Sequence, residues 1–160
     1  MNEFDNKILI LGCGNILFGD DGFGPQVAEE LQKNYQFPEH VTVINAGSRV
    51  RNILFDVVLS DVKPAKIIIV DAVDDGKTPG EIIDLPIERI PEKKIDDFSM
   101  HQLPTSNLLK ELKDLCHVDI IIIACQVEHI PEEVNGSISK KVMDAIPKAC
   151  KRIYEIIENG

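Results

Sequence analysis

The chain has 160 residues, which fits one domain spanning residues 1–160. Acidic side chains outnumber basic ones, 27 against 17, and the formal net charge is -10. Binding to nucleic-acid phosphates or to anionic lipid needs a basic face. We therefore expect neither nucleic acid nor a membrane as a partner.

Targeting signals are absent from the sequence pattern. The opening residues 1–5 are acidic and polar, unlike the basic start of a signal peptide. No apolar run approaches the roughly 20 residues of a membrane span. The cysteines form no CxxC pair, so we expect thiols in a reducing cytosol and predict a cytoplasmic protein. They are Cys13, Cys116, Cys125 and Cys150.

The predicted elements alternate between strand and helix along the chain. Short runs rich in Ile and Val predict strands, and apolar residues at helical spacing predict helices. The run at 80–85 is expected at a sheet edge, because Pro86 follows it. In the third helix, the leucines at 108, 109, 112 and 115 are expected on the inner face. In chain order the expected elements are strand 7–11, helix 22–35, strand 41–45, helix 52–60, strand 66–70, strand 80–85, helix 105–116, strand 119–125 and helix 139–158.

This alternation predicts the fold class. Continuous apolar strands such as KIIIV at 66–70 are typical of a parallel sheet that is covered on both faces. We therefore expect a doubly wound α/β fold with a mostly parallel, twisted sheet and helices on both faces. Ligands of such sheets bind outside the carboxyl ends of the strands.

The segment from Gly12 to Gly24 follows the first predicted strand and is rich in glycine. A dinucleotide fingerprint would place glycine at position 17, where the chain has Leu17, and an acidic residue where it has Asn45. Nucleotide binding by an α/β protein is therefore kept only as an alternative interpretation of this segment. Asp20 and Asp21 stand at the start of the next helix, where one carboxylate is enough for capping. We expect Asp20 to cap or support and Asp21 to be available as a ligand.

Two further residues extend this set. Asp71 comes directly after the buried strand KIIIV, and His101 precedes a predicted helix. Each has an ordinary structural alternative, a turn for Asp71 and a helix start for His101. A doubly wound sheet can bring Asp21, Asp71 and His101 to one edge. Two carboxylates and an imidazole suit a first-row divalent metal such as nickel or zinc.

These motifs together resemble the hydrogenase maturation protease family. GCGNILFGDDGFGP resembles its GxGNxLxxDxGxG opening, IIIVDAVDDGKTPG its strand-and-aspartate motif, and SMHQ its histidine motif. The segment 122–139 resembles its late strand and serine-led helix. The resemblance runs in order over nearly the whole chain, and within the family the chain looks like the coenzyme F420-reducing hydrogenase type.

The resemblance implies an endopeptidase that uses aspartates. It would remove the C-terminal extension of a nickel–iron hydrogenase large-subunit precursor after nickel insertion. Asp21, Asp71 and His101 would be the catalytic and metal-contacting residues, and the precursor would present the nickel. Many members have glutamate where this chain has Asp21, which shortens the reach of the carboxylate. The alternative is a non-catalytic, nickel-sensing chaperone for hydrogenase assembly.

The usual peptidase patterns are missing from the sequence. Neither a GxSxG elbow nor an HExxH helix occurs. Cys13 lies in the glycine-rich segment and would need a histidine base to act as a nucleophile. We therefore favour hydrolysis by a water at the substrate's nickel, with Asp21 or Asp71 as ligand or general base.

Overall fold

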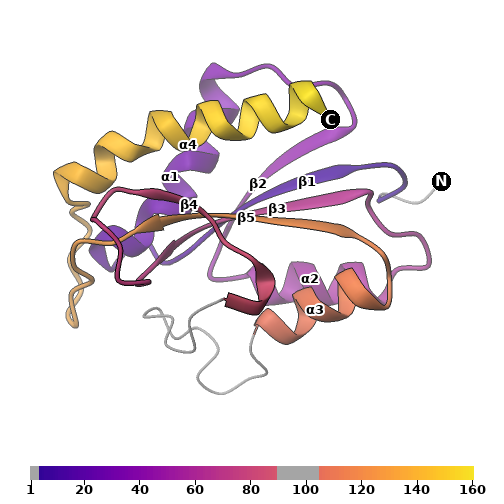
Figure 1. Cartoon of the computed structure of the whole chain (residues 1–160), viewed down its shortest axis with the longest axis horizontal. Coiled ribbons are helices and arrows are strands. Elements are labelled where there is room, and N and C mark those ends of the chain that lie inside the picture. The colour runs from indigo at the N-terminus through magenta and orange to yellow at the C-terminus, as the bar shows by residue number, and fades with distance from the viewer. Residues whose placement is uncertain (1–3, 90–104) are drawn as a thin grey trace.

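The computed structural model describes residues 4–89 and 105–160. These residues form a five-stranded sheet in the order β2-β1-β3-β5-β4, with helices on both faces (Figure 1). Only β4 is antiparallel to its neighbour, so the predicted mostly parallel α/β fold is confirmed. The strands are β1 (Ile8–Cys13), β2 (Val41–Gly47), β3 (Lys66–Val73), β4 (Ile82–Asp84) and β5 (Asp119–Gln126). The helices are η1 (Gly19–Gly22), α1 (Phe23–Asn34), α2 (Val50–Leu59), η2 (Ile87–Arg89), α3 (Thr105–Asp114) and α4 (Lys140–Asn159).

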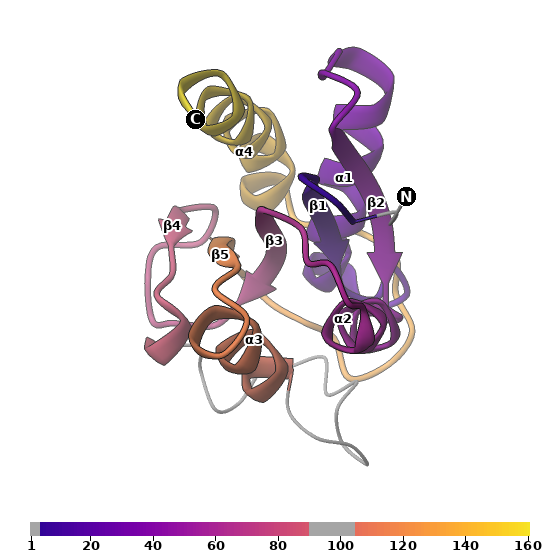
Figure 2. The ribbon, with the colours of Figure 1, turned by 90° about the vertical axis from the view of Figure 1, so that its right-hand side faces the viewer.

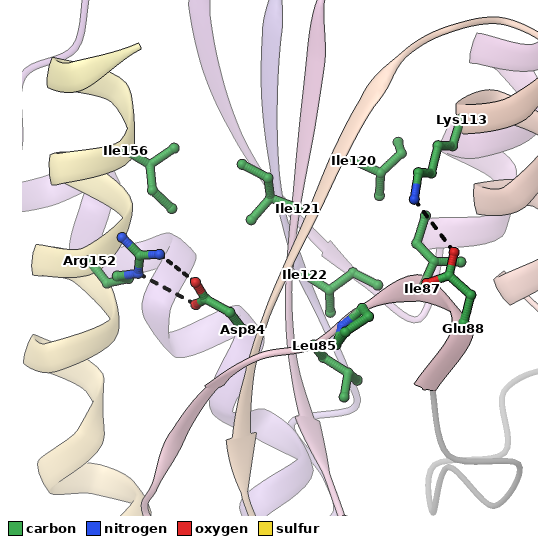
Figure 3. Close-up of a pocket in the computed structure, with 11 residues that line it drawn as sticks. Asp84, Leu85, Ile87, Glu88, Lys113, Ile120, Ile121, Ile122, Arg152 and Ile156 are labelled. Carbon is green, nitrogen blue, oxygen red and sulfur yellow. Dashed lines mark hydrogen bonds and ion pairs between the residues drawn. The ribbon is translucent and has the colours of Figure 1, made fainter.

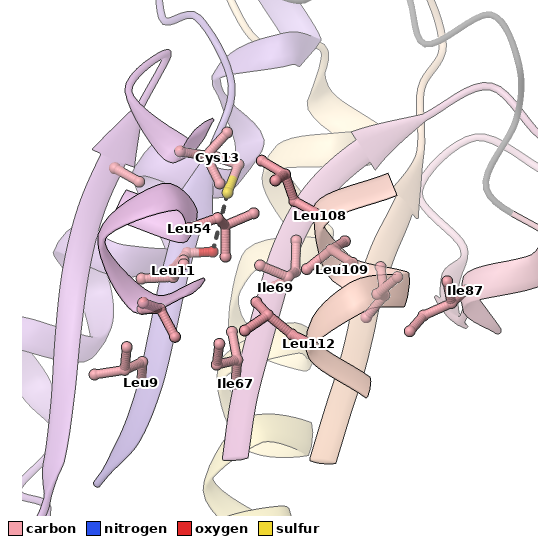
Figure 4. Packing of buried hydrophobic residues seen from close by; sticks show 14 of the residues in the cluster. Leu9, Leu11, Cys13, Leu54, Ile67, Ile69, Ile87, Leu108, Leu109 and Leu112 are labelled. Atoms are coloured by element: carbon pink, nitrogen blue, oxygen red, sulfur yellow. Dashed lines mark hydrogen bonds between the residues drawn. The ribbon is translucent and has the colours of Figure 1, made fainter. Parts of the chain in front are cut away.

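Both faces of the sheet are covered, as Figure 2 shows. Because successive strand residues point to opposite faces, Leu9 and Leu11 pack with α2 and α3, while Ile10 packs with α1 and α4. Figure 4 shows the first of these two clusters from close by. On the other face, Phe23 and Leu31 of α1 are 0% exposed. Burial of such side chains stabilises the fold by about 1.5–3 kcal/mol each.

One detail of the predicted packing was wrong. Leu115 is 74% exposed, although Leu108, Leu109 and Leu112 are buried as expected. The reason is that α3 ends at Asp114, so Leu115 no longer follows the helical repeat.

The direction in which successive strands are added to the sheet reverses between β1 and β3. From β1 the chain crosses to β2 on one side, and from β2 it returns past β1 to β3 on the other. In open α/β sheets, the carboxyl ends of the two strands at such a switch point are where ligands bind. The predicted edge position of the 80–85 strand is confirmed by β4. No helix in the described parts of the chain is long and apolar enough to cross a membrane.

Candidate functional site

The segment between β1 and α1 folds tightly over the ends of β1 and β3. A Cβ on Gly24 would lie 2.1 Å from the carbonyl oxygen of Cys13 and 2.5 Å from that of Val70. Gly14 has φ +134°, and a Cβ there would lie 2.0 Å from the carbonyl oxygen of Asp21. Only glycine permits these backbone approaches. The glycines thus hold Asp21 close to the switch point.

Asp21 lies in η1 and is 0% exposed. Its Oδ2 atom accepts a hydrogen bond of 2.7 Å from the backbone N–H of Asn15. A charge-assisted hydrogen bond of this kind helps to offset the cost of burying a carboxylate. The carboxylate of Asp21 is therefore held in place by the glycine-rich segment itself.

Asp71 lies in β3, one residue beyond the last β1–β3 pair, which joins Gly12 to Val70. It is 8% exposed, and its Oδ1 atom accepts a hydrogen bond of 2.8 Å from the N–H of Ala72. Because η1 packs against β3, Asp71 and Asp21 lie at the same carboxyl edge of the sheet. Neither aspartate is on the opposite edge, the outcome that would have ruled out a shared site.

His101 falls within residues 90–104, outside the described residues. The three-residue set of Asp21, Asp71 and His101 therefore stays a prediction. Within residues 4–89 and 105–160, no group of three or more His, Cys, Asp or Glu side chains could hold a metal ion. Of the predicted set, the described part of the chain holds the two carboxylates of Asp21 and Asp71.

Asp20 has a different role from its neighbour. It is 1% exposed and does not cap α1, whose N-cap is Gly22, so capping is not the one of its two expected roles that the structure shows. Its Oδ2 atom accepts hydrogen bonds from the N–H groups of Glu128 and His129, at 2.9 and 3.2 Å. Its oxygens also bind the N–H and the hydroxyl of Ser139, at 2.7 and 3.0 Å. Asp20 therefore ties the glycine-rich segment to the connection between β5 and α4.

Gln126 was not singled out in the sequence, yet it organises a second segment at this edge. Its Oε1 atom accepts hydrogen bonds from the N–H groups of Asp75 and Lys77, at 2.8 and 3.1 Å. Its Nε2 atom donates to Asp74 Oδ1 and to the carbonyl of Val127, at 3.1 and 3.0 Å. Gln126 is 4% exposed. It fixes the turn that follows β3, which sequence spacing could not show because the partners are distant along the chain.

Cys13 belongs to the hydrophobic cluster beneath α2 and α3. It is 1% exposed, and its Sγ donates to the carbonyl of Leu11 at 3.5 Å (Figure 4). The cysteines of the chain are thiols, as predicted from their spacing. A thiol that points into a leucine-rich cluster is poorly placed to attack a peptide bond. The packing agrees with a structural role for Cys13.

A hollow of about 330 Å³ lies on another part of the molecule, at the outer edge of β5 (Figure 3). We refer to it as the β5 hollow. Ion pairs between Arg152 and Asp84 and between Lys113 and Glu88 flank it. It is lined by the amino-terminal half of β5, away from the carboxyl end that neighbours Asp71. Its lining residues are Asp84, Leu85, Pro86, Ile87, Glu88, Lys113, Ile120, Ile121, Ile122, Arg152 and Ile156.

Comparison with protein families gives a match over most of the chain. The family model described as hydrogenase maturation protease matches residues 25–156 of this chain. A putative hydrogenase maturation protease of Methanocaldococcus jannaschii is 38% identical over 147 residues, covering 91% of this chain and 93% of the relative. The coenzyme F420 hydrogenase subunit delta of Methanothermobacter thermautotrophicus is 34% identical over 158 residues, covering 96% of each chain.

Solved structures share the fold. A [NiFe] hydrogenase maturation protease from Thermococcus kodakarensis superposes with a TM-score of 0.70 at 26% identity, covering 98% of this chain and 95% of that one. A hydrogenase maturating endopeptidase from Escherichia coli gives a TM-score of 0.74 at 23% identity, covering 96% and 93%. The second likeness, at its lower identity, concerns the fold alone.

Proposed function

Because the chain belongs to the hydrogenase maturation protease family and is therefore a hydrolase, we propose that it trims a nickel–iron hydrogenase large-subunit precursor. The cut removes the C-terminal extension after nickel has been inserted. The observation that carries the proposal is the pair of buried aspartates, Asp21 and Asp71, at the switch point of the sheet. Because the chain is 34% identical to a coenzyme F420 hydrogenase subunit, the precursor of an F420-reducing hydrogenase is the first one to test.

Nickel in this proposal belongs to the substrate. Asp21, Asp71 and His101 contact the metal that the precursor presents. Carboxylate oxygens and an imidazole nitrogen bind nickel less strongly than thiolates do, so the precursor keeps its metal. Three protein donors also leave coordination positions open for groups of the substrate. The protease alone should accordingly purify mainly without metal, and a short treatment with a chelator should leave it active.

The reaction adds one water across one peptide bond. The water oxygen bonds to the carbonyl carbon, the carbon–nitrogen bond breaks, and the leaving amine takes up a proton. One of the two carboxylates accepts the proton of the attacking water and returns it to the amine. Burial of both aspartates, at 0% and 8% exposure, supports this role, because a carboxylate shielded from bulk water interacts more strongly with a developing charge.

The test is to incubate the purified protein with nickel-loaded and with nickel-free precursor and to measure precursor mass. Nickel-loaded precursor should become shorter by one cut, and nickel-free precursor should stay intact at any enzyme concentration. The Cys13→Ala variant should cut as the wild type does. Equal cutting of both precursors by a protease that holds stoichiometric zinc would mean an ordinary metallopeptidase. Binding of nickel-loaded precursor without any cut would mean a nickel-sensing chaperone.

We further propose that the protein acts in the cytoplasm. Four cysteines remain thiols in the structure, and thiols persist in a reducing compartment. Fractionation of cells that express the chain from its own promoter would test this placement. Recovery in a membrane or an exported fraction would contradict it.

A further inference from the structure

Three large apolar side chains are exposed beside the candidate site. Ile16 is 57% exposed, Leu17 is 49% exposed and Val134 is 68% exposed. We call these three residues the apolar rim. Scattered single apolar residues are normal on a protein surface, but a group of them indicates an interaction surface. Their grouping has to be judged from the backbone that carries them.

The apolar rim is carried by two segments that are far apart in sequence and joined in space. Phe18 and Asn135 form a parallel bridge. The N–H of Asn135 donates to the carbonyl of Leu17 at 2.8 Å, and the N–H of Gly19 donates to the carbonyl of Asn135 at 2.6 Å. Val134 and Leu17 are the residues next to this bridge, one on each segment. The backbones of the two segments therefore run side by side where Leu17 and Val134 stand.

Hydrogen bonds from side chains also hold the two segments. Next to the bridge, the buried carboxylate of Asp20 binds the N–H groups of Glu128 and Ser139, at either end of the second segment. The side chain of Asn15 also accepts a hydrogen bond from the N–H of Leu17, at 2.9 Å. A surface that is ordered before binding loses less conformational entropy when a partner arrives. The apolar rim is therefore prepared for contact.

The apolar rim is continuous with the candidate catalytic edge. The N–H of Asn15, the residue before Ile16, donates to the carboxylate of Asp21 at 2.7 Å. Ile16 also lies close to η1, because a Cβ on Gly22 would stand 3.3 Å from the Cα of Ile16. The segment that binds the carboxylate of Asp21 through Asn15 therefore continues directly into the apolar rim at Ile16.

We propose that the apolar rim docks an apolar segment of the hydrogenase precursor beside the bond that is cut. This inference rests on the proposed function and adds the surface that selects the substrate. Glu132 and Glu133 are exposed and directly precede Val134. Next to such carboxylates, basic residues are favoured and acidic ones are repelled. The docked segment thus has apolar side chains at its centre and basic residues at its border.

The experiment compares rim variants with variants of two other exposed leucines, at the opposite edge of the sheet. Leu17→Ser and Val134→Ser alter the rim. Leu59→Ser and Leu115→Ser are the matched controls, because these leucines are 79% and 74% exposed at the ends of α2 and α3. Nickel-loaded precursor is the probe, with cleavage rates measured over a range of precursor concentrations. Thermal unfolding of each variant verifies that it is folded.

The rim variants should raise KM by tenfold or more with little change in kcat, and the control variants should leave both constants unchanged. Leu17→Met, which keeps an apolar surface, should restore a KM close to that of the wild type. Rim variants with the KM of the wild type, or a similar rise in KM for the controls, would overturn the inference while leaving the proposed function intact. A wild-type protein that neither binds nor cuts the precursor would overturn both. Concentration-dependent self-association of the wild type that the rim variants abolish would assign the surface to a second copy instead.

Discussion

The carboxyl ends of β1 and β3 and the β5 hollow hold their charges in opposite ways. At the carboxyl ends, Asp20, Asp21 and Asp71 are at most 8% exposed, and backbone N–H groups bind each of them. Around the β5 hollow, Asp84 and Glu88 pair with Arg152 and Lys113, and these four side chains are between 45% and 67% exposed.

This difference makes the carboxyl edge of the sheet the stronger candidate for the site of the reaction. Taking a carboxylate out of water costs several kcal/mol unless donors compensate, so a buried carboxylate persists only where the fold is built around it. An exposed ion pair costs little and forms wherever opposite charges meet. The volume of the β5 hollow is thus a weaker sign of function than three buried aspartates in a small space.

The largest effect should come from the buried aspartates at the carboxyl edge. Asp71→Asn removes the negative charge and keeps the size of the side chain, and we expect cleavage of nickel-loaded precursor to slow by about 100-fold or more. The matched control is Asp84→Asn in the β5 hollow, which should cut at the rate of the wild type. Precursor mass over time measures both. Full activity of Asp71→Asn, or loss of activity in Asp84→Asn, would reverse the assignment of the two regions.

A second effect, on stability, should separate Asp20 from exposed carboxylates. Asp20→Ala leaves the N–H groups of Glu128, His129 and Ser139 without their acceptor, and we expect unfolding to become easier by about 3 kcal/mol. The control is Asp144→Ala, whose exposed i,i+4 pair with Lys140 contributes about 0.5 kcal/mol or less. Urea unfolding followed by circular dichroism gives both values. Equal losses of unfolding free energy in the two variants would mean that the hydrogen bonds of the buried Asp20 stabilise the fold no more than an exposed ion pair does.

The contrast between Asp20 and Asp71 also shows what the sequence could reveal. In the sequence Asp71 directly follows the apolar run KIIIV, so local pattern and the switch-point rule were enough to predict its edge of the sheet, although β3 itself continues to Val73. The partners of Asp20 lie 108 to 119 residues away along the chain, and no spacing rule reaches that far. The same holds for Gln126, whose partners in the β3–β4 connection are 49 to 52 residues away.

Local sequence likewise predicted most of the fold but not its details. The strands of the parallel core are continuous apolar runs. Their succession along the chain and their parallel pairing could therefore be inferred from the sequence. The two-residue earlier start of α2, at Val50, fits the helical spacing of the buried residues Val50, Leu54 and Val57, which the predicted range 52–60 left out. The exposure of Leu115 depends on where α3 ends, and helix ends are the least predictable part of a pattern.

A third effect should appear at alkaline pH in two buried thiols. Burial, and to a lesser degree the charge of Asp20, raise the pKa of Cys125 to about 12. Burial, and then the charge of Glu30, raise the pKa of Cys150 to about 12. Between the ordinary thiol pKa of 9.0 and about 12, the unfolded chain loses these protons and the folded chain keeps them. The free energy of unfolding should therefore fall as pH rises through that range and be unaffected by these thiols below it.

The measurement is urea unfolding at a series of pH values, for the wild type and for Cys125→Ala and Cys150→Ala. Each variant should show a shallower decline above pH 9, the ordinary pKa of the removed thiol. Asp20→Asn sharpens the regional comparison, because it should lower the pKa of Cys125 and leave that of Cys150 unchanged. An identical decline in the wild type and in both cysteine variants would contradict the burial argument.

The smallest effect should come from the β5 hollow itself. Arg152 donates from Nε to Asp84 at 3.4 Å and from Nη2 to the other carboxylate oxygen, and this pairing raises the pKa of Arg152. Because both side chains are about half exposed, water and salt screen the attraction, and Arg152→Ala should destabilise the fold by no more than about 1 kcal/mol. That loss should shrink further in high salt, and cleavage of the precursor should not change. Lys151→Ala removes the same charge from an exposed neighbour and controls for net charge alone. If Arg152→Ala instead cost several kcal/mol or slowed cleavage tenfold while Lys151→Ala did neither, exposed pairs would matter as much as buried carboxylates in this fold, and the contrast between the two regions would fail.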